Sequence, residues 1–128
     1  MNKNYYITTP IYYPSAKPHM GHAYSSIIAD FFARLKRIQG FNVYFLTGTD
    51  EHGQKIQRAA EEKKMDPLLF CDEISKTFRD LSDTLNLSNN DFIRTTEPRH
   101  AKSVENLWNV LEKKGEIYLS KYSGWYSV

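Results

Sequence analysis

One stretch of the chain, from Phe41 to Thr47, is apolar at every position except Asn42 and its final threonine. A nearly continuous apolar run is typical of a strand in a parallel sheet that helices cover on both faces, because neither face of the strand meets water. Nearer the N-terminus, Tyr5–Thr9 is aromatic and β-branched and stops at Pro10, which is typical of a short strand that leads into a loop. The two segments predict two strands of one parallel sheet.

The segment between these strands, residues 19–39, has the periodicity of a helix. Its apolar residues recur at helical spacing, and Gly40 follows as a stop signal. The order strand, helix, strand predicts a right-handed βαβ unit in an α/β fold, and such folds bind ligands at the carboxyl ends of their strands. The periodic residues are Met20, Tyr24, Ile27, Ile28, Phe31, Phe32, Leu35 and Ile38.

Further helices and strands are predicted downstream. Gln54–Lys64 is polar and helical in character, and Asp66-Pro67 offers an N-cap and a first-turn proline for a helix that ends near Asn86. The remaining predictions are a short strand at Phe92–Arg94, a helix opening at Thr96-Glu97-Pro98 with Val104, Leu107, Trp108 and Leu111 inward, and a β-hairpin that pairs Ile117–Leu119 with Trp125–Val128.

Bulk properties exclude several classes of protein. The net charge of +2, from 17 basic and 15 acidic residues, is too small to identify a nucleic-acid surface. The single cysteine, Cys71, excludes a disulfide framework and favours a reducing setting. No stretch approaches the roughly 18 apolar residues of a membrane span, and the N-terminus lacks the apolar core of a signal peptide. We therefore expect a soluble, cytoplasmic protein without a membrane partner.

Two histidines, His19 and His22, stand three residues apart at the start of the first predicted helix. They project from one side of a helix N-terminus, where free N–H groups and the helix dipole attract anions such as phosphate. Gly21 between them allows a ligand to approach the backbone. Spacing alone also allows two surface histidines or half of a metal site.

The run Pro18-His19-Met20-Gly21-His22, with the strand and loop before it, resembles the HIGH motif of class I aminoacyl-tRNA synthetases. The resemblance implies that His19, Gly21 and His22 bind ATP, and that the two histidines are catalytic because they stabilise charge on the transferred group. Leucyl-, isoleucyl- and valyl-tRNA synthetases share the motif, so it indicates the class and not the amino acid.

The exit of the second predicted strand, Thr47–Gln54, is similar to the GTDEHG segment of methionyl-tRNA synthetases, whereas branched-chain enzymes typically have a tryptophan-aspartate pair there. Methionine is therefore the implied substrate. Asp50 is well placed for a charge-assisted hydrogen bond to an ammonium group, the role that the family assigns to it. An Asx-turn or an N-cap is the alternative on sequence alone. The next two residues, Glu51 and His52, are expected to shape the nucleotide pocket, and an exposed loop histidine is equally compatible with the spacing.

The Tyr-rich loop after the first strand also resembles the family, which implies that Pro10, Ile11 and Tyr13 line the methionine side-chain site. An aromatic and apolar slot suits a thioether. The alternative is a rigid connection that faces the core. No zinc site is supported, because Ser127 stands where the first cysteine of the family's zinc-binding insertion would fall.

The resemblance as a whole implies ATP-dependent activation of methionine, with Mg²⁺, and transfer to tRNA(Met). Residues 1–115 are expected to form the first half of a Rossmann-like catalytic domain, and residues 116–128 the start of a connecting insertion. The second ATP motif of the family, KMSKS, does not occur in the sequence, so these residues alone are expected to be inactive. The alternatives are a non-catalytic remnant and a piece of a leucyl-type synthetase.

Overall fold

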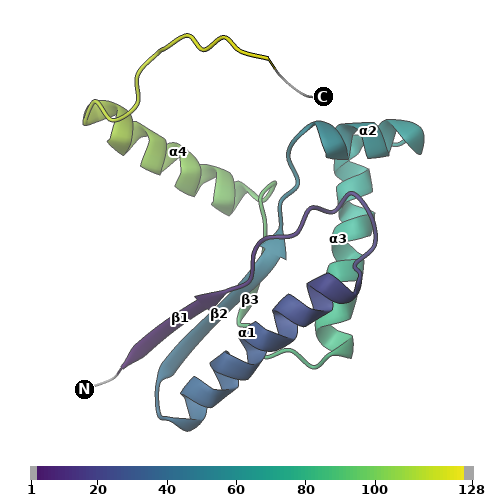
Figure 1. Ribbon diagram of the computed structural model, residues 1–128, viewed down its shortest axis with the longest axis vertical. Coiled ribbons are helices and arrows are strands. Elements are labelled where there is room, and N and C mark those ends of the chain that lie inside the picture. The colour runs from purple at the N-terminus through teal and green to yellow at the C-terminus, as the bar shows by residue number, and fades with distance from the viewer. Residues whose placement is uncertain (1–2, 126–128) are drawn as a thin grey trace. The chain divides into compact units, whose positions relative to one another are not determined.

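A computed structural model describes residues 3–125 (Figure 1). The chain forms two compact units that divide between Glu97 and Pro98. The first unit contains the sheet and the candidate site, and the second contains one helix and the segment after it. The predicted boundary after residue 115, between a catalytic domain and a connecting insertion, stays a prediction.

The first unit is built on a parallel sheet of three strands, β1 (Asn4–Thr8), β2 (Asn42–Thr49) and β3 (Asp91–Arg94), in the order β1-β2-β3. The predicted α/β class and both early strands are confirmed. Because the strands are parallel, their carboxyl ends lie at one edge of the sheet, where the loops after β1 and β2 meet.

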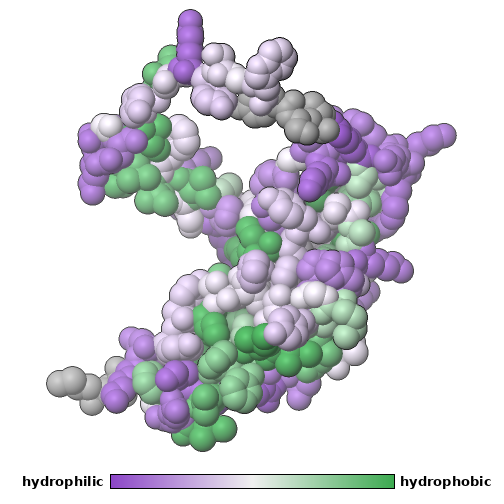
Figure 2. All heavy atoms as spheres, in the orientation of Figure 1, coloured by the Kyte–Doolittle hydropathy of each residue, from purple (hydrophilic) through white to green (hydrophobic). Residues whose placement is uncertain are grey.

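Helix α1 (Met20–Ile38) covers β1 and β2 through small residues. Its Ala29 and Ala33 form an apolar cluster with Val43 and Phe45 of β2. The large apolar residues that predicted this helix lie mainly on its outer face, where Figure 2 shows apolar atoms gathered over α1. Alanines allow the helix to approach the strands closely, so the packing face is the less conspicuous one in the sequence.

The prediction that β2 is buried on both faces is wrong. Val43, Phe45 and Thr47 are buried on the face that α1 covers, whereas Tyr44 on the other face is 45% exposed. Alternate residues of a strand point to opposite faces. Tyr44 stacks on Tyr6 of β1, so the apolar run of β2 includes an aromatic residue on a face that no helix of the first unit covers.

Two further helices, α2 (Gln54–Glu62) and α3 (Pro67–Thr84), build the second apolar cluster. Helix α3 begins as predicted, because the Asp66 carboxylate accepts hydrogen bonds from the N–H groups of Leu68 and Leu69 at 2.9 and 3.1 Å. The cluster comprises Tyr12, Ile56, Ala60, Phe70, Cys71, Ile74, Phe78 and Phe92. It lies beneath the strand ends and supports them from one side.

In the second unit, α4 (Pro98–Lys113) confirms the predicted helix but not its inward face. Val104, Leu107 and Trp108 are half or more exposed, and no α4 residue is buried. The first half of the predicted hairpin is also wrong, because Ile117–Leu119 forms no strand. Its second half, Trp125–Val128, lies almost wholly outside the described residues. Within residues 3–125, no helix is long and apolar enough to cross a membrane.

Candidate functional site

The start of α1 is capped by its own two histidines. His19 is the N-cap residue with extended backbone, and its Nδ1 accepts a hydrogen bond from the N–H of Gly21 at 3.0 Å. In return, Nδ1 of His22 accepts a hydrogen bond from the N–H of His19 at 3.0 Å. This is a reciprocal capping box in which imidazole nitrogens replace the usual side-chain oxygens.

The capping box determines which nitrogen of each ring carries the proton. An Nδ1 that accepts a backbone N–H must be unprotonated, so neutral His19 and His22 keep their proton on Nε2. Burial, and secondarily the charge of His19, lowers the pKa of His22. The helix start therefore presents two Nε2–H donors that the cap does not use, beside the positive end of a helix dipole.

Gly21 also leaves room for the cap. A Cβ at this position would lie 2.9 Å from Cε1 and 3.1 Å from Nδ1 of His19. The glycine thus leaves room for the His19 ring to fold back over the helix start. The ring centroids of His19 and His22 are 3.9 Å apart, so both donors face the same region.

A cavity of about 440 Å³ joins this helix start to the loop after β1. Of the residues predicted to bind ligands, Pro10, Ile11, Tyr13, His19 and His22 line it. The side chains of Ile11 and Tyr13 are 40% and 55% exposed, so they are open to a ligand and the alternative of a core-facing connection does not hold for them. Sequence reasoning missed two cations in the same lining, Lys17 and Lys55, which suit an anionic ligand.

Tyr12, between the two predicted pocket residues, is the core-facing member of the loop and was also missed. It is 7% exposed, and its hydroxyl lies 2.9 Å from Oγ of Ser26 and donates to the carbonyl of His22 at 3.3 Å. Its ring contacts that of His22 edge-on at 4.8 Å between centroids. Its backbone pairs with β2, accepting from the N–H of Asp50 and donating to the carbonyl of Gly48, each at 2.9 Å. One residue therefore ties the histidine pair to the exit of β2.

Asp50 follows the last residue of β2 and is partly exposed. Helix α2 begins after Gly53 without a side-chain cap, so Asp50 does not serve as its N-cap. Asp50 is not part of the lining of the 440 Å³ cavity. The N–H of Asp50 nonetheless donates a hydrogen bond to the carbonyl of Tyr12, and Tyr12 lines that cavity.

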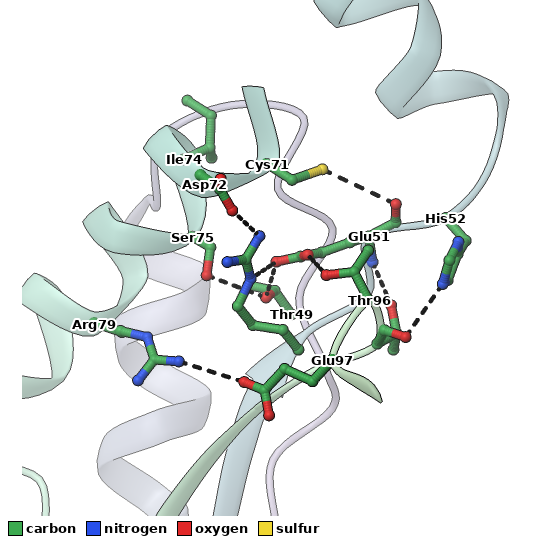
Figure 3. A network of polar contacts seen from close by, with 12 residues as sticks. Thr49, Glu51, His52, Cys71, Asp72, Ile74, Ser75, Arg79, Thr96 and Glu97 are labelled. Atoms are coloured by element: carbon green, nitrogen blue, oxygen red, sulfur yellow. Dashed lines mark hydrogen bonds and ion pairs between the residues drawn. The ribbon is translucent and has the colours of Figure 1, made fainter. Parts of the chain in front are cut away.

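The two residues that follow Asp50, Glu51 and His52, point in different directions (Figure 3). The Glu51 side chain is fully buried and pairs with Arg94, with Nε and Oε1 2.7 Å apart. His52 is exposed, and its Nε2 donates to the carbonyl of Thr95 at 3.3 Å. Both residues also line a second cavity of about 510 Å³ on the α2 side.

A parallel sheet with a histidine-capped helix after its first strand, and an acidic turn after its second, is the arrangement that the resemblance to class I aminoacyl-tRNA synthetases implied. Residues 5–128 match the family described as tRNA synthetases class I (M). The chain belongs to this family, the methionyl branch of the class.

Individual relatives agree with this assignment. The chain is 58% identical over 126 residues to a mitochondrial methionine–tRNA ligase of Takifugu rubripes. The aligned residues are 98% of this chain and 21% of that relative. Its fold matches the Mycobacterium tuberculosis methionyl-tRNA synthetase in complex with methionyl-adenylate with a TM-score of 0.93 and 46% identity, over 98% of this chain and 25% of that one. The chain thus spans about a fifth to a quarter of the length of these relatives.

A leucyl-tRNA synthetase of Agrobacterium radiobacter K84 matches with a TM-score of 0.79 and 24% identity, over 91% of this chain and 15% of that one. At this identity the likeness concerns the fold alone. The family match and the methionine-specific relatives decide against the leucyl-type alternative.

Proposed function

We propose that this chain contributes to ATP-dependent activation of methionine to methionyl-adenylate, and to its transfer to tRNA(Met). The observation that carries the proposal is the single cavity between the loop after β1 and the start of α1. It collects the residues that the family resemblance assigns to ATP, His19 and His22, and those that it assigns to the methionine side chain, Pro10, Ile11 and Tyr13. A reaction that joins a carboxylate to a nucleotide needs both ligands in one place.

In this reaction the methionine carboxylate attacks the α-phosphorus of ATP, the bond to the β-phosphate oxygen breaks, and pyrophosphate leaves. Negative charge grows on the phosphoryl oxygens, and the Nε2–H groups of His19 and His22 are donors suited to it. Lys17 and Lys55 in the same lining add positive charge. Magnesium would enter with the ATP phosphates, because their oxygens are the hard ligands that it prefers.

The methionine end of the site rests on Asp50, Ile11 and Tyr13. The Asp50 carboxylate suits the α-ammonium group of the amino acid, because a charge-assisted hydrogen bond forms at a partly exposed position. Exposed Ile11 and Tyr13 side chains are free to close around a thioether. The adenylate then passes its methionyl group to the 3′-terminal adenosine of tRNA(Met).

Amino-acid-dependent exchange of pyrophosphate into ATP by the natural full-length protein tests the proposal. We expect exchange with methionine and none with leucine. Asp50→Asn should raise the KM for methionine about 30-fold, the equivalent of one charged hydrogen bond of about 2 kcal/mol. Asp83→Asn, which alters an exposed aspartate of α3, is the matched control. It should change neither the KM for methionine nor the KM for ATP.

Exchange with leucine but not methionine would overturn the substrate, and exchange with neither would favour the non-catalytic alternative. A methionine KM unchanged by Asp50→Asn would remove Asp50 from the site while leaving the activity in place.

A further inference from the structure

The acidic turn after β2 is held from inside by a charged network that the proposed function does not use. We propose that Arg94 is a positioning residue, which acts through Glu51 to hold Asp50 in the orientation that receives the methionine ammonium group. This inference rests on the proposed function of Asp50 and deepens it.

The network centres on the Glu51 carboxylate (Figure 3). The Glu51 side chain is 0% exposed. Its Oε1 accepts from Nε of Arg94 at 2.7 Å and from the hydroxyl of Thr49 at 2.8 Å, and its Oε2 accepts from the hydroxyl of Thr96. The Arg94 guanidinium, itself 19% exposed, also contacts Oδ1 of Asp72 on α3 at 2.6 Å. One carboxylate therefore joins the end of β2 to the end of β3, and Arg94 extends the connection to α3.

The turn is held at each of three consecutive residues, through the main chain of Asp50 and Glu51 and through the side chain of His52. The N–H of Asp50 donates to the carbonyl of Tyr12 at 2.9 Å. The N–H of Glu51 donates to Oγ1 of Thr95 at 2.8 Å, and the His52 ring donates to the carbonyl of Thr95 at 3.3 Å. With Glu51 pointing inward, Asp50 and His52 on either side of it are more exposed. The inward direction of Glu51 therefore determines the outward direction of Asp50.

Arg94 is the cation that makes the inward direction of Glu51 favourable. A buried carboxylate whose cationic partner is removed is strongly destabilised, because it has lost water without gaining a compensating charge. The hydrogen bond between Arg94 and Glu51 raises the pKa of Arg94, although burial opposes this effect, so the guanidinium stays charged. If Arg94 were removed, no cation would stand between Glu51 and the like charge of Asp72. We expect Glu51 to turn out towards water in that case and to displace Asp50 with it.

This role differs from general stabilisation because the histidine pair is held by a capping box within residues 19–22, and its link to the turn through Tyr12 is a main-chain contact that does not pass through Arg94. His19 and His22 are fixed by their own capping box and by Tyr12, and none of these contacts involves Arg94. Loss of Arg94 should therefore weaken methionine binding and spare ATP binding, whereas a loosened fold would impair both.

The test measures methionine-dependent pyrophosphate exchange in the natural full-length protein, with KM determined separately for methionine and ATP. Arg94→Ala should raise the methionine KM by roughly 10-fold to 100-fold, the effect of a displacement of about 1 Å, with the ATP KM within about threefold of that of the unaltered protein. Arg94→Lys should restore part of the loss. Lys76→Ala, which removes a cation from an exposed ion pair on α3, is the control and should change neither constant.

The double variant Glu51→Gln with Arg94→Ala separates positioning from other roles of Arg94. A neutral amide needs no cation, so the double variant should have a lower methionine KM than Arg94→Ala alone. Equal methionine KM values in the double variant and in Arg94→Ala would overturn the inference. Parallel rises in the methionine KM and the ATP KM of Arg94→Lys would also overturn it. The lysine variant provides the test if Arg94→Ala does not fold. Absence of exchange in the unaltered protein would overturn the proposed function as well, whereas exchange with an unchanged methionine KM in Arg94→Ala would overturn the inference alone.

Discussion

Replacing Gly48 by alanine should separate the two strands that carry the acidic turn. Gly48 pairs with Ile93, and a Cβ at Gly48 would lie 2.0 Å from the carbonyl oxygen and 2.7 Å from Cγ2 of Ile93. Non-bonded atoms need about 3.5 Å, so β2 and β3 must move apart by more than an ångström. We estimate about 1–3 kcal/mol for the overpacking and about 1 kcal/mol for each of two ladder hydrogen bonds lost. The local free energy of unfolding should fall by about 3–5 kcal/mol, a large part of a typical total.

Hydrogen exchange followed by mass spectrometry measures this loss strand by strand. Amides of β2 and β3 should exchange roughly 10²-fold to 4 × 10³-fold faster in Gly48→Ala, since each 1.4 kcal/mol is tenfold in an opening equilibrium. Gly40→Ala is the matched control: Gly40 has φ +80° with nothing within 4 Å of an added Cβ, so it should lose only about 1 kcal/mol from backbone strain. Protection of β2 in Gly48→Ala equal to that in Gly40→Ala would refute the reasoning.

Three further predictions concern the histidine cap and the buried thiol. Gly21→Ala should push the His19 ring off the helix start, lose about 1 kcal/mol of capping and raise the ATP KM severalfold, and an unchanged KM would contradict this. Because the pKa of His22 is lowered, its contribution to stability is present above its ordinary value of about 6.5 and is lost as the pH falls below it. Nitrogen NMR should find His22 titrating below 6.5 with its proton on Nε2, and a proton on Nδ1 would speak against the cap. Burial, and then the charge of Glu51, raises the pKa of the Cys71 thiol to about 11, so iodoacetamide should label it at pH 8 only after unfolding, and prompt labelling of the native protein would argue otherwise.

Local signals in the sequence predicted most elements of the fold. The Asp66-Pro67 start of α3 is readable because its cap and its proline act within one helical turn. The histidine pair was likewise readable as an anion-binding helix start, although its mutual capping was not. Periodicity identified α1 as a helix but not its packing face, because alanines form that face while larger residues stay exposed.

Interactions between distant residues could not be read in this way. Glu51 and Arg94 are separated by 43 residues, and a charged residue in a loop is ordinarily solvated. Only the pairing of β2 with β3 brings them together. The same holds for Tyr12, which looked like its exposed neighbours Ile11 and Tyr13 until the bridge to β2 placed it in the core.

The parallel register at Gly48 has a consequence for how this region tolerates change. The two consecutive residues after β2 differ in burial, because Asp50 is partly exposed and Glu51 is buried. A one-residue slip of a strand moves every side chain to the other face, so deletion of a single residue within β2 would bury Asp50, the proposed anchor of the methionine ammonium group, and expose Glu51, which pairs with Arg94. Any odd-numbered insertion or deletion in β2 should therefore abolish activity even where the fold survives.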